Sequence, residues 1–478
     1  MYLKRHHFFL FFFFTYISAF SQMVEWPLAP KRIVWLAAEH ASFGDGTTKE
    51  LPLDVSTAEK LDKALHKLSL EFGVYGEGLV LHFLSGYYET HGIRLRPRWH
   101  LVGAGLDQTR FKLIPSLKHL KVKSAYHSVI GGGWGPQFSA GLGGERLYKR
   151  DFDNIRVSDV SLDCNWSGMK KELGPIIKKA SGIDLLVKQA LVERVKVNNF
   201  GAVGGRPSWR EVFPIRVISG MGDGAVLPGY RKSIIEIRHC IVEGSVLGSD
   251  IGTEWPYCTG IMVSHNEADP ENFIVRALVH HNEILNVVNG IAFGGAFLKT
   301  AEFYSNKVTN CGIGFNFDTG SNRDVVIRNN NFLQCIGGGS VNNGKHFEIR
   351  NNNFLLRAPD DSRFSYWHNG LRIWDHTRGF VVKDNRFEFN GKTKKLSRGI
   401  ILHGLNVGFR MFQNDSSKWQ IQIDPHRFIN NHYVGLLPNV AGPQEASHNM
   451  YLGIGNRSVN LTGVDGVGDG IQFYWNDD

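Results

Sequence analysis

The sequence contains little cysteine and proline. Of its 478 residues, 5 are Cys and 16 are Pro, whereas 54 are Gly. A small and odd number of cysteines excludes a fold held together by a disulfide framework. Many glycines with few prolines favour short strands joined by tight turns. Cys311 and Cys335 are 24 residues apart, and we expect stacked free thiols there, with a disulfide or a metal pair as the alternatives.

Long apolar runs are also missing, except for one at the N-terminus. It extends from Phe8 to about Phe20 after a basic start, which is too short to cross a bilayer comfortably. The small residues Ala19 and Ser21 precede a suitable cleavage point near Gln22, as in a secretory signal peptide. We therefore predict a signal peptide at residues 1–21 and a secreted or periplasmic protein with no membrane span in the mature chain.

The sequence lacks the motifs of several enzyme classes. No phosphate-binding loop, dinucleotide fingerprint, zinc-ligand spacing or Ser-His-Asp pattern occurs. The Gly-rich segments at 131–135 and 466–470 lack the strand and helix that phosphate binding needs. The net charge is +9, but no basic stripe is interleaved with aromatic residues, so no nucleic-acid partner is expected. The positive balance is compatible with an acidic polysaccharide, although a solvated basic surface is the more common meaning of such a charge.

What the sequence does contain is a repeat. VVIRNNNFLQC at 325–335 is followed by FEIRNNNFLLR at 347–357. Weaker copies read VHHNEI at 279–284, FYSNKV at 303–308 and VKDNRF at 382–387. The recurring asparagines are separated by 24, 24 and 22 residues and are Asn282, Asn306, Asn330 and Asn352. A period of this size is the signature of a solenoid.

Short β-rich runs fill the segments between these asparagines, for example GIGFNFDTG at 312–320 and GLRIWDH at 370–376. They leave no room for helices, which excludes βαβ units. A turn of three short strands needs about one period of residues, and successive turns can pair in parallel at roughly 4.8 Å. We therefore predict an all-β fold, a right-handed parallel β-helix in which each rung buries one apolar stripe.

The repeated asparagines are predicted to build the scaffold rather than to contact a substrate. Asn tolerates the left-handed backbone conformation and therefore suits a sharp corner between strands. If every rung turns at the same place, the Asn side chains stack and hydrogen-bond along the column. The Ile or Val before them and the Phe after them would then point into the coil.

An amphipathic helix is predicted ahead of the coil, at residues 56–72. Ser56 and Glu59 have the spacing of a capping box. Apolar residues then recur at helical spacing, at Leu61, Leu65, Leu68 and Phe72. Such a helix would cover the open end of the first rung and protect its strand edges. Strand-like runs at 79–84, 92–96, 99–103 and 109–114 indicate that the coil begins directly afterwards.

The N-terminal region also resembles a known family. FGDGTT at 43–48, the predicted helix, GLVLHFLSGYYET at 78–90, GIRLRP at 92–97 and WHLVGAG at 99–105 resemble the opening of secreted pectate-lyase-like β-helix proteins, including rhamnogalacturonase- and epimerase-like members. The chain departs from them at KELPLDVST and at Ser85. The resemblance implies a cap with first rungs at 22–115, further rungs with loop insertions at 116–478, and a polysaccharide lying along one face of the coil.

Strand alternation predicts which residues of that face point outward. Inward positions are assigned to Ile313, Phe315, Phe317, Leu371, Ile373, Ile400 and Leu402. The outward residues are predicted to form one column of Asn316, Ser340, Trp374 and His403, with Asp318, Asn342 and His376 beside it and Arg372 also outward. A polar stripe with one aromatic residue is a suitable floor for a carbohydrate groove.

The outward residues are candidates for contact with a substrate, and several of them have a structural alternative. Candidate catalytic groups, as proton acceptors or charge neutralisers, are Asp318, Arg372, His376 and His403, and Arg372 is alternatively a surface ion pair. Asp318 is also the candidate Ca²⁺ ligand, or else a turn cap. The predicted substrate contacts are Asn316, Asn342, Trp374 and Lys394. Trp374 would stack on a sugar ring or be covered by the loop 357–368, and Lys394 would meet a uronate chain or belong to a solvated loop.

Three functions remain open. β-Elimination needs a group that neutralises a uronate carboxylate and a base that takes the C5 proton, and the groove can supply both. Glycoside hydrolysis needs two carboxyl groups about 5–9.5 Å apart, but the Asp pairs at 360–361 and 477–478 are not on predicted groove strands. The leading hypothesis is a secreted lyase-like protein acting on an acidic, uronate-containing polysaccharide. The alternatives are a non-catalytic carbohydrate-binding or structural surface β-helix and a glycoside hydrolase of an unrecognised β-helix type.

Overall fold

The computed structural model describes most of residues 32–434 and short stretches beyond. The described ranges are 32–72, 78–116, 125–132, 154–187, 189–202, 212–219, 232–245, 258–265, 274–294, 299–318, 322–342, 344–358, 369–373, 377, 379–390, 398–402, 409–415, 418–423, 427–429, 431–434, 458–459, 471–472 and 474–475. The predicted signal peptide lies outside these ranges.

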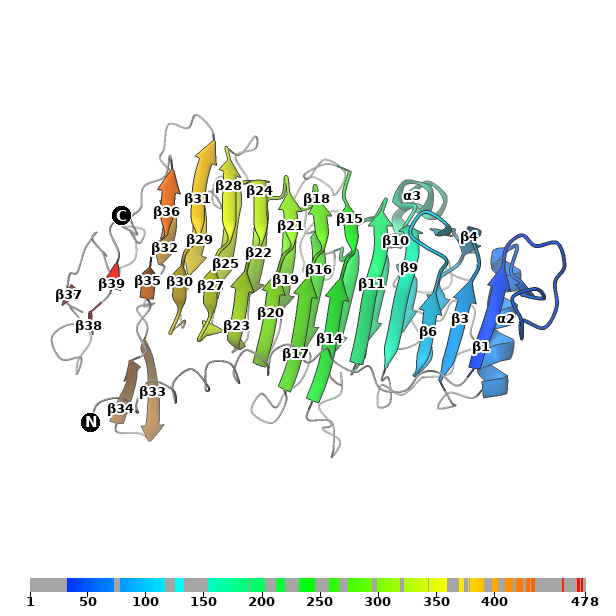
Figure 1. Cartoon of the computed structure of the whole chain (residues 1–478), viewed down its shortest axis with the longest axis horizontal. Helices are drawn as coiled ribbons and strands as arrows, with labels where there is room; N and C mark the ends of the chain where they lie inside the picture. The colour runs from blue at the N-terminus through cyan, green and yellow to red at the C-terminus, as the bar shows by residue number, and fades with distance from the viewer. Residues whose placement is uncertain are drawn as a thin grey trace, which may run out of the picture.

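Most described residues belong to strands that pair in parallel with the equivalent strand of the next rung (Figure 1). The strands form one sheet of 24 strands, here called sheet A, and one of 11 strands, here called sheet B. In Figure 1 the chain rises through sheet A in front, returns through sheet B behind and advances from right to left. This sense of winding is right-handed, so the predicted right-handed parallel β-helix is confirmed.

Sheet B forms one face of the coil. Its parallel strands are β5 (Ile93–Arg94), β8 (Ala125–Gly132), β10 (Ile177–Leu186), β13 (Ile215–Ser219), β16 (Thr259–His265), β19 (Asn289–Gly294), β22 (Ile313–Asp318), β25 (Gly337–Val341), β29 (Asn369–Ile373) and β32 (Arg398–Leu402). The short strand β12 (Gly201–Ala202) pairs antiparallel with β10.

Sheet A bends at a corner and supplies two faces, called lower and upper after their places in Figure 1. The lower face holds β1 (Arg32–Ala37), β3 (Leu79–Phe83), β6 (Trp99–Val102), β14 (Lys232–Arg238), β17 (Ile274–His280), β20 (Lys299–Tyr304), β23 (Asn322–Arg328), β27 (Glu348–Arg350), β30 (Val381–Lys383) and β35 (Arg427–Ile429). The upper face holds β4 (Gly86–Thr90), β7 (Thr109–Leu113), β15 (Ile241–Glu243), β18 (Glu283–Leu285), β21 (Lys307–Thr309), β24 (Asn331–Cys335), β28 (Asn353–Arg357), β31 (Arg386–Asn390) and β36 (His432–Val434). Two long strands, β9 (Ile155–Asp163) and β11 (Gln189–Asn198), run through both faces.

The remaining strands are short or antiparallel. β2 (Leu53–Asp54), β26 (Gly344–Lys345) and β39 (Tyr474–Trp475) extend sheet A by pairing with β1, β23 and β35. The strands β33 (Phe409–Asp415) and β34 (Lys418–Ile423) form an antiparallel pair, as do β37 (Ser458–Val459) and β38 (Ile471–Gln472).

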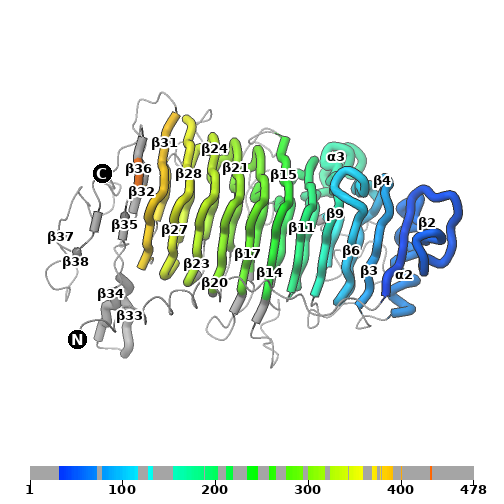
Figure 2. Tube along the Cα trace, viewed as in Figure 1, coloured from blue at the N-terminus to red at the C-terminus, as the bar shows by residue number. Residues whose placement is uncertain are grey.

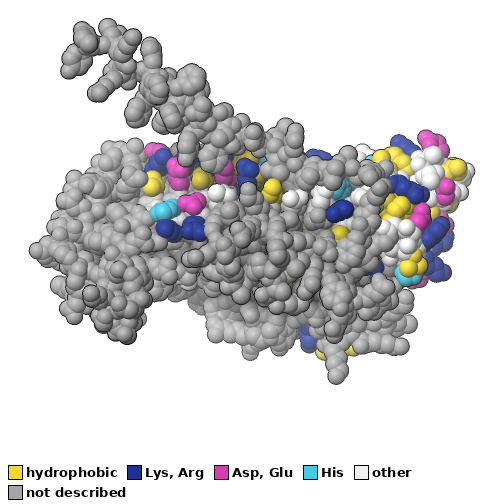
Figure 3. Space-filling view, turned by 90° about the horizontal axis from the view of Figure 1, so that it is seen from below, with side chains coloured by type: hydrophobic (Ala, Val, Ile, Leu, Met, Phe, Trp, Pro, Cys, Tyr) yellow, Lys and Arg dark blue, Asp and Glu magenta, His cyan; other side chains and the backbone are white. Residues whose placement is uncertain are grey.

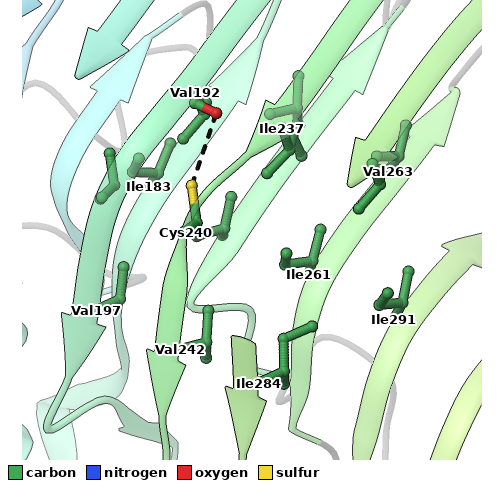
Figure 4. Close-up of a cluster of buried hydrophobic side chains, with 14 of the residues drawn as sticks. Ile183, Val192, Val197, Ile237, Cys240, Val242, Ile261, Val263, Ile284 and Ile291 are labelled. Atoms are coloured by element: carbon green, nitrogen blue, oxygen red, sulfur yellow. Dashed lines mark hydrogen bonds between the residues drawn. The ribbon is translucent and has the colours of Figure 1, made fainter. Parts of the chain in front are cut away.

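The interior of the coil is filled by apolar stripes, one from each face. Figure 4 shows Ile183 and Ile261 of sheet B approaching Val192 and Ile237 of the lower face. Successive rungs are evenly spaced along the coil (Figure 2), so residues at equivalent positions of neighbouring rungs stack on one another. The ring centres of Phe332 and Phe354 are 4.8 Å apart, and those of Phe354 and Phe387 are 4.7 Å apart. Such burial of apolar surface is the main term that stabilises the coil.

All five cysteines are buried free thiols, and the predicted stacking of Cys311 and Cys335 as free thiols is confirmed by the contact between their side chains. Burial raises the pKa of the Cys311 thiol well above its usual value, and the neighbouring Cys335 raises it further. The Cys311 thiol therefore does not ionise near neutral pH, which makes it an unreactive core residue.

The repeated asparagines form the predicted ladder along the corner of sheet A. The side-chain amide of Asn306 donates to Asn330 Oδ1 at 2.9 Å, and Asn330 donates to Asn352 Oδ1 at 2.9 Å. The ladder continues through Asn385 to Asn431. One detail differs from the prediction: the residue in the left-handed conformation precedes the ladder residue, for example Asn329 with φ of 55°. In this repeat one Asn therefore adopts the left-handed conformation of the corner, and the Asn after it forms the hydrogen bonds of the ladder.

Glycine recurs at the start of the sheet B strands because neighbouring rungs approach closely there. A Cβ added to Gly290 or Gly314 would lie 2.4 Å from the carbonyl oxygen of the glycine one rung on. At Gly338 the same distance to Gly370 is 2.1 Å. No side chain fits at these separations, so these positions in β19, β22 and β25 require glycine.

The predicted cap is the helix α2 (Ala58–Phe72), which lies at the N-terminal end of the coil in Figure 1. Its predicted core-facing residues Leu61, Leu65 and Leu68 are buried, and Phe72 packs against the core. The cap residue differs from the prediction, since Thr57 Oγ1 accepts from the Lys60 amide while Ser56 contacts the Lys60 ammonium. A second short helix, α3 (Trp166–Leu173), was not predicted; it buries Trp166 and Met169 beside β10 and leads into a 3-10 turn at Gly174–Ile176.

Candidate functional site

The outer face of sheet B carries a column of one side chain per rung. Each residue pairs with the next in the order Asp184, Arg216, Met262, Ala292, Asn316, Ser340 and Arg372. At roughly 4.8 Å per rung, the column is about 29 Å long. Small side chains occupy its centre and charged side chains its ends. This column is called the outer column below.

The register of the outer column corrects one prediction. Asn316 pairs with Ser340 as expected, but Ser340 pairs with Arg372 and not with Trp374. Arg372 in turn pairs with Ile401, so His403 does not follow in this column either. The predicted inward residues whose side chains are described are all buried, namely Ile313, Phe315, Phe317, Leu371, Ile373 and Ile400. The side chain of Leu402 lies outside the described part.

The predicted residues are described to different extents. Asn316 and Asn342 are half-buried, and the Asn342 amide extends the strand pairing by donating to Phe317 O at 2.8 Å. Asp318 ends β22, but its side chain lies outside the described part. Four further predicted residues also lie outside it, namely Trp374, His376, Lys394 and His403. Their roles and the Ca²⁺ ligand role of Asp318 stay predictions.

Arg372 is more enclosed than predicted. Its side chain was expected to point into solvent, yet the residue is 6% exposed and has interaction partners within the protein. The Arg372 guanidinium therefore places a positive charge beneath the surface here. Charge in a water-poor environment attracts a carboxylate more strongly than the same charge in bulk water.

A buried ionic cluster marks the other end of the outer column and was missed from the sequence. Asp184, 2% exposed, accepts two hydrogen bonds from Arg216, at 2.8 and 2.5 Å. The Arg216 guanidinium lies 4.9 Å from the centre of the Phe213 ring, and Lys179 lies 5.4 Å from it. Burial, with the charge of a neighbouring arginine, lowers the pKa of Arg94 to about 10. The alternation in SGIDLL at 181–186 was a sufficient signal for an outward Asp184.

No metal centre is evident in the described part of the chain. Among the residues in the described ranges, no group of three or more His, Cys, Asp or Glu side chains surrounds a common metal position. In the same ranges no helix is long and apolar enough to cross a membrane. At the end of the coil that holds α2, Figure 3 shows Lys, Arg, Asp and Glu side chains interspersed with apolar ones, without a large patch of one sign.

The lower face of sheet A carries a second outward column, which the sequence analysis did not identify. It runs through Glu193, Arg238, His280, Tyr304, Arg328, Arg350 and Lys383, each paired with the next, and is called the polar ladder below. The His280 and Tyr304 rings stack at 4.5 Å and 7°, and the Arg328 guanidinium lies 4.2 Å from the Tyr304 ring centre. The signal was the polar or aromatic residue before each corner, such as the Arg of RNNNF.

Ion pairs tie the polar ladder together at its N-terminal end. Glu193 is 1% exposed and accepts hydrogen bonds from Arg156, Arg194 and Arg238. Burial raises the pKa of Glu193, but the hydrogen bond from Arg238 and the charges of the three arginines hold it below its usual value overall. Burial, followed by the charge of His280, lowers the pKa of His239.

Comparison with known proteins gives distant structural similarities only. No protein-family model and no curated sequence matches the chain. An exopolygalacturonase from Thermotoga maritima aligns with a TM-score of 0.44 and 12% identity over 87% of this chain and 92% of that one. The A-module of the mannuronan C-5 epimerase AlgE6 from Azotobacter vinelandii gives 0.41 and 14% over 80% and 93%. The Streptococcus pneumoniae surface adhesin PfbA gives 0.45 and 13% over 84% and 97%.

Proposed function

We propose that the protein binds an acidic polysaccharide along the outer column of sheet B and cleaves it by β-elimination. The observation that carries the proposal is the register that places Arg372 beside Ser340 and two rungs from Asn316. Small polar side chains next to a shielded cation suit a chain of uronates, whose carboxylates are accepted by Arg and Asn donors. The elongated column suits a linear polymer better than a compact ligand.

In this mechanism Arg372 and Asn316 hold the uronate carboxylate. Withdrawal of charge from that carboxylate acidifies the C5 proton, and a base then removes it. The electron pair forms a C4–C5 double bond while the C4–oxygen bond breaks, and the leaving oxygen takes up a proton. His376 and His403 are the proposed base and acid, because an imidazole titrates near neutral pH. Asp318 would supply Ca²⁺ binding if a metal assists the carboxylate.

The test is the ultraviolet absorbance of the unsaturated product when the purified full-length protein is mixed with a panel of uronate polysaccharides. The proposal predicts a rise for at least one polymer, and at least about a hundredfold slower rise for Arg372→Ala, since a charge-stabilising donor contributes that much. Arg386→Ala is the matched control, because Arg386 lies on the upper face of sheet A and is exposed. A chelator tests the metal role of Asp318.

A glycoside hydrolase is the weaker proposal. It needs two carboxyl groups across the scissile bond, but among the described side chains of the outer column only Asp184 is a carboxylate, and it is bound to Arg216. A non-catalytic binding protein is favoured by one observation, the 6% exposure of Arg372. A guanidinium so enclosed reaches the carboxylate of a reacting sugar less readily than an exposed one. Retention of a polysaccharide on the protein with neither unsaturated product nor new reducing ends would support binding alone and overturn the elimination proposal.

A further inference from the structure

Three histidines from two neighbouring rungs meet at the corner of sheet A and are called the histidine cluster below. His280 ends β17, and His281 follows it in the left-handed conformation with φ of 55°. His239 occupies the same corner position one rung earlier, with φ of 54°. The His281 ring stacks on the His239 ring and meets the His280 ring edge-on, with 5.1 Å between centres in both cases. His239 and His281 are exposed, so protons from solvent reach the cluster directly.

One hydrogen bond within the histidine cluster requires a particular protonation state. The Nδ1 atoms of His280 and His281 are 2.8 Å apart, so one of them donates and the other accepts. His280 Nε2 lies 3.2 Å from Glu236 Oε1, and because an ionised carboxylate only accepts, His280 Nε2 carries a proton. His280 Nδ1 is therefore the acceptor and His281 Nδ1 the donor. A proton added to His280 Nδ1 would set two N–H groups against each other and break this bond.

The carboxylates that face the histidine cluster are already paired with arginines. Glu236 of β14 pairs with Arg238 of the same strand at 2.8 Å. The other titratable or charged groups among the described residues that face the cluster are Glu193 and Arg194 of β11, Glu302 and Tyr304 of β20 and Arg328 of β23. Both of these glutamates also pair with an arginine. Protonated imidazoles would therefore add positive charge where the negative charge is already compensated.

We propose that the histidine cluster is an acid-sensitive switch, which joins the rungs of β14 and β17 at their corner while it is neutral and releases them when it is protonated. The cluster lies where the asparagine ladder begins, at Asn282. The same two rungs supply Arg216 and Met262 to the outer column. Because each rung is one continuous turn of the chain, release of the corner would also loosen the support of these two residues. The switch does not depend on the proposed lyase activity.

The expected direction of the pH effect follows from the two exposed histidines. Burial, and then the charge of His280, lower the pKa of both His239 and His281 below the usual 6.5. The unfolded chain therefore takes up protons first, so stability is complete above about pH 6.5 and falls as the pH decreases toward the folded pKa. Glu193 is distinguishable, because its contribution is lost only below its usual 4.5.

The test is urea denaturation of the full-length protein at about pH 7.5 and about pH 5.5, a window above the Glu193 transition. The variant is His281→Asn, which removes the donor of the Nδ1 bond. Asn keeps the corner, since Asn329 and Asn351 already adopt this left-handed conformation at equivalent positions. His346→Asn is the matched control, because His346 is another exposed histidine with φ of 55°. All other histidines are shared and cancel in the comparison.

A second measurement is local. The His281 amide donates to Tyr304 O at 3.2 Å, and the His239 amide donates to His280 O at 3.3 Å. Hydrogen–deuterium exchange of the peptides that contain these two amides, corrected for the intrinsic effect of pH on exchange, reports whether the corner opens in acid.

Between the two pH values the folding equilibrium constant of the wild type and of His346→Asn should fall at least about tenfold, as for a pKa shift of one unit, and that of His281→Asn less than about threefold. The corrected exchange of the two corner amides should accelerate in acid in the wild type and in His346→Asn, and much less in His281→Asn. An equal loss of stability in all three proteins, or none in the wild type, would overturn the proposal.

Discussion

The same corner of the coil is held by two different chemistries in its two halves. From Asn282 to Asn431 the residue after the left-handed position is a buried Asn, bonded amide to amide along the ladder. In the rungs of β9 and β11 the equivalent position is Val160 and Val195. In these rungs the corner is held by outward side chains instead, and the Arg194 guanidinium donates two hydrogen bonds to the Asp159 carboxylate, at 2.6 and 2.9 Å.

This difference separates a neutral corner from a charged one. Arg194 and Asp159 are themselves in the left-handed conformation, with φ of 50° and 63°, which costs about 1–2 kcal/mol per residue. Their two hydrogen bonds and the adjacent Glu193 cluster offset that cost. A ladder of amides does not respond to acid, whereas a corner made of carboxylates and guanidinium groups does. The N-terminal half of the coil is therefore expected to loosen first in acid.

The largest effect is expected from breaking the neutral corner with Asn330→Ala. The Asn330 side chain donates to Asn352 Oδ1 and Phe303 O, and its oxygen accepts from the amide and side chain of Asn306. Losing four buried hydrogen bonds at about 1 kcal/mol each should lower the free energy of unfolding by about 4 kcal/mol. Urea denaturation measures it. Asn331→Ala, at an exposed neighbour, is the control, and a comparable loss there would contradict the ladder's role.

The next effect is expected from the charged corner, through Glu193→Gln. The glutamine leaves three arginines without their shared carboxylate in a 1% exposed position. Removing one partner of a buried charge cluster costs about 3 kcal/mol. Urea denaturation should show this loss, with Glu283→Gln on the exposed face as control. A Glu193 variant as stable as the control would mean that the cluster contributes nothing net.

Acid should remove the difference in the free energy of unfolding between the wild type and Glu193→Gln. The folded pKa of Glu193 lies below its usual 4.5, so its contribution is complete above the unfolded pKa and disappears as the pH falls through the folded pKa. The free energies of unfolding of the two proteins should therefore converge below about pH 4.5. Asn330→Ala should keep its full deficit over the same range. A constant gap for Glu193→Gln would refute the assigned pKa direction.

The fold could be predicted because the period and the alternation are both local signals. The asparagine spacing predicted the length of one rung, and alternation alone placed Phe315 and Leu371 inside the coil. The register of the outer column could not be counted, because Ser340 and Arg372 are 32 residues apart rather than 24. Pairing Ser340 with Trp374 instead of Arg372 shifts the strand register by two residues, and such a shift leaves the same residues pointing inward and outward. Alternation therefore cannot detect it.

The polar ladder was missed for a related reason. Each of its residues is visible as an outward polar position, but their meaning depends on which one lies one rung away. Glu193 and Arg238 are 45 residues apart and become partners only through the pairing of β11 with β14. The candidate site is thus less predictable than the scaffold, because its chemistry arises between rungs of unequal length.

The smallest effect is expected at an exposed ion pair within the asparagine-laddered half. Lys307 Nζ lies 2.6 Å from Glu283 Oε1, but the two side chains are 52% and 39% exposed. Lys307→Gln should lower the free energy of unfolding by at most about 0.5 kcal/mol, and high salt should remove the difference. Arg194→Gln, which breaks contacts with Asp159 and the buried Glu193, should cost more at either salt concentration. Equal costs for the two variants would mean that the charged corner behaves as ordinary surface, and the distinction between the two halves would then rest on the amide ladder alone.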